Sequence, residues 1–171
     1  SAANADLLYF DDRQKRDATR DEMLASDPFS YFIPVGSSNK IGTLGFVNAA
    51  YELRAQIEKG IVPEPDYIYV PIGSGGTVAG LLLGVTLASL KTKIVAVPVV
   101  PNCQQIFYPL VCRLFFEANA LLHENDTSIP LSDFPKEKII FSDECSGVSY
   151  GLWMQEDVFT IKSFKDLENI S

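Results

Sequence analysis

Between residues 67 and 90, a short apolar segment, a run of glycines and a longer apolar segment follow one another. Residues 67–70 (Tyr-Ile-Tyr-Val) have the composition of a buried strand, and residues 73–77 (Gly-Ser-Gly-Gly-Thr) that of a turn. Residues 78–90 contain no charged side chain and predict a helix buried on all sides. Because neither element can bury its apolar surface alone, this order indicates a sheet with helices packed against it.

The same order of strand and helix extends over most of the chain. Strands are predicted at residues 31–35, 67–70, 93–97 and 138–141, and helices at 41–59, 78–90, 104–122 and, more briefly, from Ser163. Residues 11–27 predict an exposed, charged helix or connector. The alternation predicts an α/β fold, a three-layer parallel sheet with helices on both faces, whose strand-end loops share one edge.

The composition disfavours several classes of function. At 171 residues, 47% of them hydrophobic and 21% charged, the chain suits one compact domain with a real core. Fourteen lysines and arginines against 22 aspartates and glutamates give a net charge of −8, which disfavours nucleic acid as a partner. The longest apolar run, residues 81–90, is far shorter than the roughly 20 residues of a membrane span. We therefore expect neither nucleic acid nor membrane as a partner.

The first residues of the chain and its cysteine content give expectations about the cellular compartment of the protein. No charged and apolar leader with a small-residue cleavage site opens the chain, so secretion is not indicated. The three cysteines, Cys103, Cys112 and Cys145, are an odd number without a CxxC pair, which predicts neither a disulfide framework nor a zinc site. A cytoplasmic location fits this content best.

The glycine loop is the strongest candidate site. Its residues are Gly73, Ser74, Gly75, Gly76 and Thr77. Consecutive glycines let backbone N–H groups approach an anion closely, and the dipole of the following helix adds positive potential behind them. The loop therefore predicts a phosphate site, to which Thr77 could add a hydroxyl. The alternative is a tight turn that needs glycines only for packing.

Other ligand and catalytic motifs are missing from the sequence. No glycine is followed by Lys and then Ser or Thr, which excludes a Walker loop. A dinucleotide fingerprint would place its third glycine at Val78, so the loop suits a phosphate monoester better than a pyrophosphate. The only histidine, His123, lies at a predicted helix end and is expected to be structural. Asp143 and Glu144 have no histidine partners, so we expect no metal site.

Three stretches resemble one family, the fold type II pyridoxal-phosphate enzymes related to the tryptophan synthase beta chain. Residues 33–47, which begin Ile-Pro-Val-Gly-Ser-Ser-Asn, resemble the IPxGxS…GxxG[FY]V segment of its D-cysteine desulfhydrase and 1-aminocyclopropane-1-carboxylate deaminase group. Residues 73–80 are similar to its GSGGTxAG loop, and residues 147–151 to its GxGYG turn, with Ser149 in place of a glycine. The match covers about residues 28–151.

The resemblance implies a cofactor and a reaction. Pyridoxal 5′-phosphate would be held at its phosphate by residues 73–77, while Ser38 and Asn39 would line the mouth of the site and Tyr150 would close over the ring. The implied enzyme is a lyase or deaminase of a small amino acid. D-cysteine would give pyruvate, sulfide and ammonia, and 1-aminocyclopropane-1-carboxylate would give 2-oxobutyrate and ammonia. A domain without its first and last segments should expose a sheet edge or apolar surface, so a homo-oligomer is expected.

The resemblance implies a partial chain as well. Relatives are roughly twice as long and carry the lysine that binds the cofactor covalently in an N-terminal region, so the catalytic lysine is expected outside this chain. Lys40 lies beside the Ser38-Asn39 turn and is interpreted as an exposed side chain. Residues 1–27 are interpreted as the end of a preceding small domain, and residues 28–171 as a cofactor-domain core without its C-terminal end.

Two functions remain open at this point. The first is the cofactor-phosphate-binding portion of an enzyme, which by itself would be inactive. The alternative is a non-enzymatic binding module that uses the glycine loop for a phosphorylated ligand or a partner.

Overall fold

The computed structural model describes residues 6–101, 104–142, 149, 151–152 and 154–168 and divides the chain into two compact units, Ser1–Pro34 and Val35–Ser171. The first unit contains helix α1 (Arg13–Ser26). Its cap is Asp12, whose carboxylate accepts the Gln14 N–H at 2.8 Å. No residue of α1 is buried, which confirms the predicted exposed helix.

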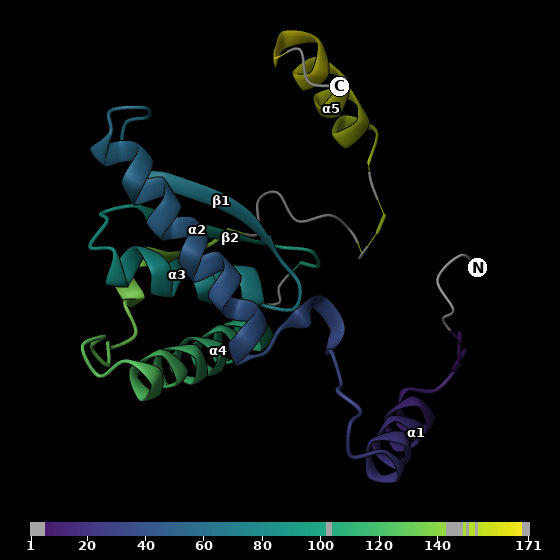
Figure 1. The fold of residues 1–171 in the computed structure, drawn as a ribbon. Coiled ribbons are helices and arrows are strands. Elements are labelled where there is room, and N and C mark those ends of the chain that lie inside the picture. Colours follow the sequence, from purple (N-terminus) through teal and green to yellow (C-terminus); the bar gives the residue numbers. More distant parts are fainter. Residues whose placement is uncertain (1–5, 102–103, 143–148, 150, 153, 169–171) are drawn as a thin grey trace. The chain divides into compact units, whose positions relative to one another are not determined.

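The second unit is an α/β domain (Figure 1). In chain order it contains η1 (Val35–Ser37), α2 (Lys40–Glu58), β1 (Tyr67–Ile72), α3 (Gly76–Leu87), β2 (Lys93–Pro98), α4 (Gln104–Asn125), η2 (Lys136–Lys138), β3 (Ile139–Phe141) and α5 (Gln155–Glu168). The three strands form a parallel sheet in the order β1-β2-β3, and in this register Tyr69 pairs with Val95 and Val95 with Ile140. The predicted α/β class with a parallel sheet is confirmed. In the described residues, however, α3 packs against one face of the sheet, and the exposed Tyr67 and Tyr69 leave the other face without the predicted layer of helices.

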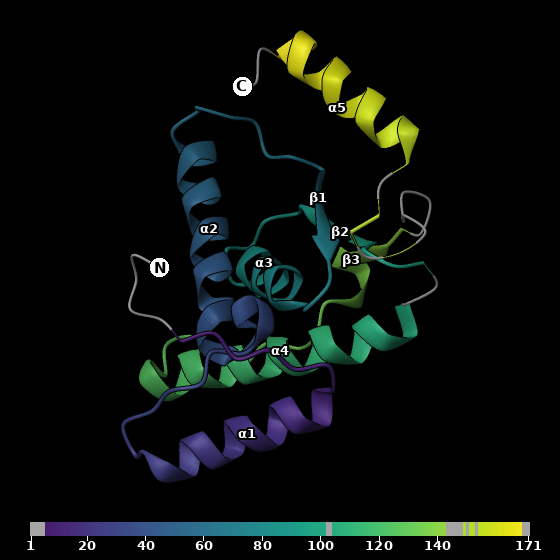
Figure 2. The ribbon, with the colours of Figure 1, turned by 90° about the vertical axis from the view of Figure 1, so that its right-hand side faces the viewer.

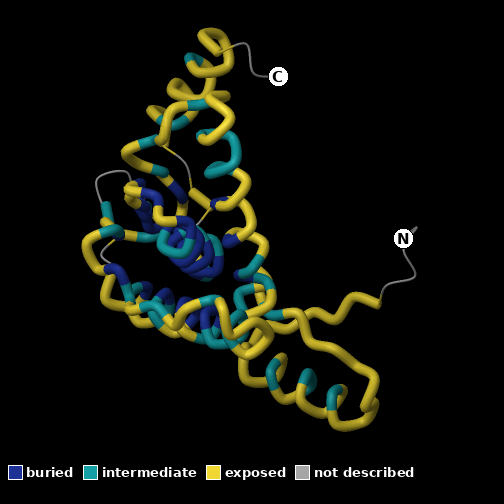
Figure 3. Tube along the Cα trace, turned by 60° about the vertical axis from the view of Figure 1, so that its left-hand side comes forward, coloured by how far each residue is buried: buried dark blue, intermediate teal, exposed yellow. Residues whose placement is uncertain are grey.

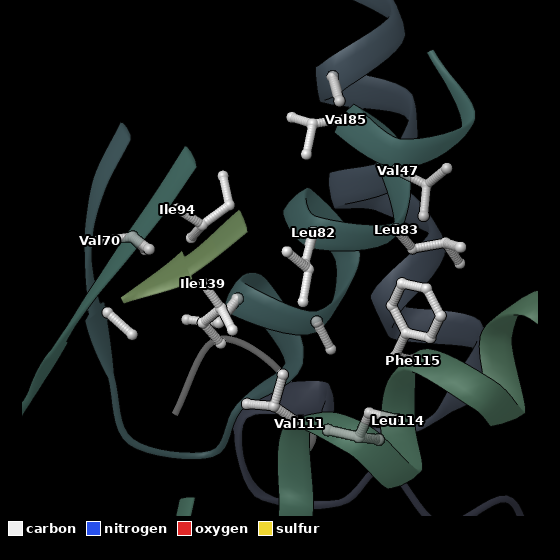
Figure 4. Close-up of a cluster of buried hydrophobic side chains, with 14 of the residues drawn as sticks. Val47, Val70, Leu82, Leu83, Val85, Ile94, Val111, Leu114, Phe115 and Ile139 are labelled. Carbon is white, nitrogen blue, oxygen red and sulfur yellow. The ribbon is translucent and has the colours of Figure 1, made fainter. Parts of the chain in front are cut away.

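Helix α3 forms the centre of this domain. It lies between α2 and the strands (Figure 2), and the buried positions of the chain gather along it (Figure 3). In Figure 4, Leu82 faces Val70, Ile94 and Ile139 of the three strands, while Leu83 lies on the side of α2 and α4. The buried helix predicted from residues 78–90 is confirmed. No helix in the described part of the chain is long and apolar enough to cross a membrane.

Two glycines of α3 set how closely it packs against α2. A Cβ atom at Gly80 would overlap the carbonyl oxygen of Thr43 and lie 2.6 Å from the Cβ of Phe46. At Gly84 it would lie 2.6 Å from the Cβ of Ala50. Small residues at these positions therefore let the two helix backbones approach, and the N-terminal ends of α2 and α3 lie near each other.

One predicted strand is wrong. Residues 31–34 are irregular, and residues Val35–Ser37 form a single 3-10 turn in which Gly36 has a φ of 68°. The side chains of Phe32 and Ile33 are exposed, and Pro34 offers no N–H for a ladder. A short apolar run becomes a strand only when a neighbouring strand pairs with it, and no described strand does so here.

The last predicted helix starts in the wrong place. Helix α5 begins at Gln155, and Ser163 lies in its interior rather than at its cap. Glu156 and Asp157 are in the first turn, where carboxylates interact favourably with the helix dipole. The Asp157 carboxylate also accepts the Met154 N–H at 2.7 Å, just before the helix begins. The predicted turn at 146–151 lies mostly outside the described residues.

Candidate functional site

The glycine loop lies at the carboxyl end of the sheet. Strand β1 ends at Ile72, whose carbonyl oxygen accepts the Val99 N–H at 3.1 Å just after β2. After β3, the Ser142 N–H donates to the carbonyl oxygen of Ala96 at 3.0 Å. These bonds extend the parallel ladder past each strand end, so the three loops leave the sheet at one edge. Ligands of open parallel sheets bind at this edge.

Gly75 gives the loop its shape. It caps α3 with a φ of 84°, a left-handed conformation that side chains with a Cβ atom rarely adopt. A Cβ at this position would also lie 3.3 Å from the Cγ of Leu110 and 3.5 Å from the Cδ1 of Leu114. Both leucines belong to α4 and form an apolar floor beneath the loop. The chain therefore turns sharply into the helix over a water-poor surface.

The N-terminus of α3 is open to an anion. Its first backbone hydrogen bond runs from the Ala79 N–H to the carbonyl oxygen of Gly75, so the N–H groups of Gly76, Thr77 and Val78 precede it without helical partners. Gly75 supplies no side-chain cap, and the first turn has no acidic residue. The Gly76 N–H donates to the Oγ of Ser38 at 3.3 Å, whereas no described group accepts the N–H of Thr77 or Val78. These two donors and the helix dipole fit a phosphate group.

The neighbouring helix shows the opposite arrangement. The side-chain oxygen of Asn39 caps α2 and accepts the N–H groups of Ile41 at 3.0 Å and Gly42 at 2.8 Å. Asn39, predicted to line the site, therefore has its oxygen committed to its own helix. Of these two helix ends, α3 is the one that offers donors to a ligand.

A second loop packs against the glycine loop. It contains Gly36 at a φ of 68°, where a Cβ would lie 2.9 Å from the Cβ of Ser74. Ser38 follows, and its Oγ lies 2.6 Å from the Oγ of Ser74 and accepts the Gly76 N–H at 3.3 Å. The structure thus brings the predicted lining residue Ser38 against the predicted phosphate loop.

The predicted site residues differ in exposure. Gly75 and Gly76 are buried, Ser74 and Thr77 are half-buried, and Gly73 is exposed, so the loop presents its first residues and the Thr77 side to solvent. Lys40, the first residue of α2, is exposed as predicted. Tyr150 lies outside the described residues.

Sequence reasoning did not assign Gly36 to the site, and it missed the leucine floor. The glycine that opens the turn at residues 36–39 was a usable signal, because a glycine there permits a positive φ beside another loop. No local pattern pairs the loop with Leu110 and Leu114, which lie one strand and one helix further along the chain.

Two other side chains that could react, His123 and Cys112, have surroundings that fit a structural role. The Nδ1 of His123 lies 2.7 Å from the carbonyl oxygen of Ile129 and ties the end of α4 to the following loop. Burial raises the pKa of the half-buried Cys112 thiol, which therefore stays protonated near neutral pH. In the described ranges no three His, Cys, Asp or Glu side chains are grouped to hold a metal. Cys103 and Cys145 fall outside those ranges.

Comparison with known proteins points to one family. A family model described as pyridoxal-phosphate dependent enzyme matches residues 2–117. A bifunctional D-cysteine desulfhydrase/1-aminocyclopropane-1-carboxylate deaminase of Arabidopsis thaliana, described as mitochondrial, is 39% identical over 99 residues, 56% of this chain and 24% of that protein. A D-cysteine desulfhydrase of Klebsiella pneumoniae is 29% identical over 153 residues, 90% of this chain and 42% of that protein.

A solved structure shares the fold. The crystal structure of an ACC deaminase homologue superimposes with a TM-score of 0.72 and 24% sequence identity, over 99% of this chain and 49% of that one. At this identity the likeness shows the fold alone. The chain spans less than half the length of each of these relatives. The relatives named are enzymes, which favours the enzyme over the non-enzymatic binding module.

Proposed function

Because the chain belongs to the family of pyridoxal-phosphate-dependent enzymes, we propose that it carries the cofactor-phosphate site of a lyase or deaminase that acts on a small amino acid. The observation that supports this most directly is the N-terminus of α3, where Gly75 supplies no side-chain cap and no described group accepts the N–H of Thr77 or Val78. The residues assigned to the phosphate are Gly73, Ser74, Gly75, Gly76 and Thr77.

Each part of the loop has a role in this proposal. The left-handed turn at Gly75 leads into the first turn of α3, where the N–H groups of Thr77 and Val78 would donate to the phosphate, and the hydroxyl of half-buried Thr77 would add a donor at the open side. Leu110 and Leu114 keep water from the underside of the loop, which strengthens the electrostatic attraction for the phosphate. When bound, pyridoxal phosphate supplies an electron sink for carbanions next to an amino group.

The proposed substrates come from the names of the relatives. D-cysteine and 1-aminocyclopropane-1-carboxylate are both small amino acids, and proteins named for their breakdown match this chain. The catalytic residues for either reaction are not assigned to this chain. We place residues 28–171 in the cofactor domain and residues 1–27 at the end of a preceding domain. The free Cys112 thiol supports a reducing compartment such as the cytoplasm.

The proposal is tested by comparing two ligands. Pyridoxal 5′-phosphate is expected to bind the protein more tightly than pyridoxal, by about tenfold for each charge-assisted hydrogen bond to the phosphate. Isothermal titration of both ligands measures the ratio. Equal dissociation constants for the two ligands would show that the loop does not recognise phosphate and would remove the basis of the proposed function.

We also propose that the protein self-associates through the second face of its sheet. Side chains alternate along a strand, so Tyr67, Tyr69 and Ile140 point away from α3, and they are 48%, 71% and 38% exposed. The strands place no carboxylate on this face, so copies of a chain with net charge −8 can approach here without acid repulsion.

Sedimentation at several concentrations tests this association. Tyr69→Lys is expected to weaken dimerisation by about tenfold, because each copy loses a large exposed ring from the interface. Tyr51→Lys makes the same change on α2, where the tyrosine is 42% exposed, and should leave the association constant unchanged. A wild-type chain that stays monomeric at high concentration would contradict the proposal.

A further inference from the structure

Three polar atoms connect the two loops of the site in a row. The Gly76 N–H donates to the Oγ of Ser38 at 3.3 Å, and the Oγ of Ser38 lies 2.6 Å from that of Ser74. Ser38 precedes α2, whereas Ser74 and Gly76 flank the start of α3. The row is therefore a tertiary contact and not a local feature of the glycine loop.

The donors in this row can be ordered. A backbone N–H only donates, so Ser38 must accept from Gly76. The single hydroxyl hydrogen of Ser38 then has two acceptors within reach, the Oγ of Ser74 at 2.6 Å and the carbonyl oxygen of Gly36 at 3.4 Å. Hydroxyl hydrogen bonds are ordinarily about 2.5–3.0 Å long, so the contact with Ser74 is the stronger of the two. In the structure Ser38 donates to Ser74, and the hydrogen of Ser74 is left for another acceptor.

We propose that Ser38 is a positioning residue of the phosphate site, which orients the hydroxyl of Ser74 so that it donates to the bound phosphate. This inference rests on the proposed function. The row starts at an N–H in the first turn of α3, the positive end of the helix dipole, and each donor polarises the next toward an anion. A phosphate dianion can only accept, so an outward-pointing Ser74 O–H is the arrangement that it requires.

A double-mutant cycle tests the inference. Ser38→Ala and Ser74→Ala are each expected to weaken pyridoxal 5′-phosphate binding by about tenfold, the value of one charge-assisted hydrogen bond. The double variant should be no weaker than the poorer single variant, because both substitutions remove the same bond. The dissociation constant of pyridoxal should change by less than about twofold, whereas a general distortion of the loop would weaken both ligands.

Two further variants serve as controls. Ser38→Thr keeps the hydroxyl and should restore most of the affinity, with thermal unfolding used to confirm that each variant folds. Ser37→Ala removes the exposed neighbouring hydroxyl and should bind like the wild type. If Ser38→Ala binds pyridoxal 5′-phosphate as tightly as the wild type, or more tightly, the inference is overturned. Ser38 would then do no more than accept the hydrogen bond of the Gly76 N–H, in competition with the phosphate. If the wild type binds pyridoxal 5′-phosphate and pyridoxal equally, the proposed function itself fails.

Discussion

Replacing Gly75 with valine is expected to weaken binding of pyridoxal 5′-phosphate by roughly two to four decades. Gly75 caps α3 at a φ of 84°, a conformation that strains a β-branched residue. Relief of this strain moves the loop, and the N–H groups of Thr77 and Val78 shift away from the phosphate. Two charge-assisted hydrogen bonds of about 1.5–3 kcal/mol each are then lost.

The measurement is a titration of the protein with pyridoxal 5′-phosphate, with Gly60→Val as the matched control. Gly60 also has a positive φ, 69°, but lies just after α2 with no atom within 4 Å of the position where its Cβ would be. Gly60→Val therefore carries the backbone strain without touching the site, and its cofactor affinity should equal that of the wild type. Equal affinities of wild type and Gly75→Val would mean that the loop is only a packing turn.

Gly80→Ala is expected to destabilise the fold by about 2–3 kcal/mol, which corresponds to a fall in melting temperature of roughly 4–12 °C. The added methyl group would overlap the carbonyl oxygen of Thr43 and lie 2.6 Å from the Cβ of Phe46. Backbone atoms of a packed helix yield little, so α2 and α3 must separate. This separation costs more than the roughly 1 kcal/mol that alanine gains over glycine in a helix.

Gly45→Ala is the control for this prediction. It makes the same glycine-to-alanine change within a helix, but the expected change in stability has the opposite sign. Gly45 lies in α2, is exposed, and has no atom within 4 Å of its potential Cβ. Only the helix propensity acts there, so the variant should be stabler by about 0.5–1 kcal/mol. Chemical denaturation measures both variants. A Gly80→Ala protein as stable as wild type would show that the close approach of the two helices is not required.

The success of the sequence predictions depended on how local their signals were. The strand at residues 67–70, the glycine turn and the helix after it were recognised because all three lie within one stretch of chain, and the structure has β1 and α3 there. The strand at residues 31–35 was predicted from composition alone and was wrong. Whether an apolar segment forms a strand depends on a pairing partner, and composition does not reveal one.

The sequence by itself determined the parallel α/β class, the buried character of α3 and the resemblance to the pyridoxal-phosphate enzymes, because apolar periodicity and glycine spacing are properties of short segments. Tertiary structure alone decided that Asn39 caps α2, whereas the cap residue of α3, Gly75, supplies no side chain to its helix. It also placed Ser38 against Ser74 and the leucines of α4 beneath Gly75. A sequence pattern shows which face of an element is buried, but the partner of that face depends on how the whole chain packs.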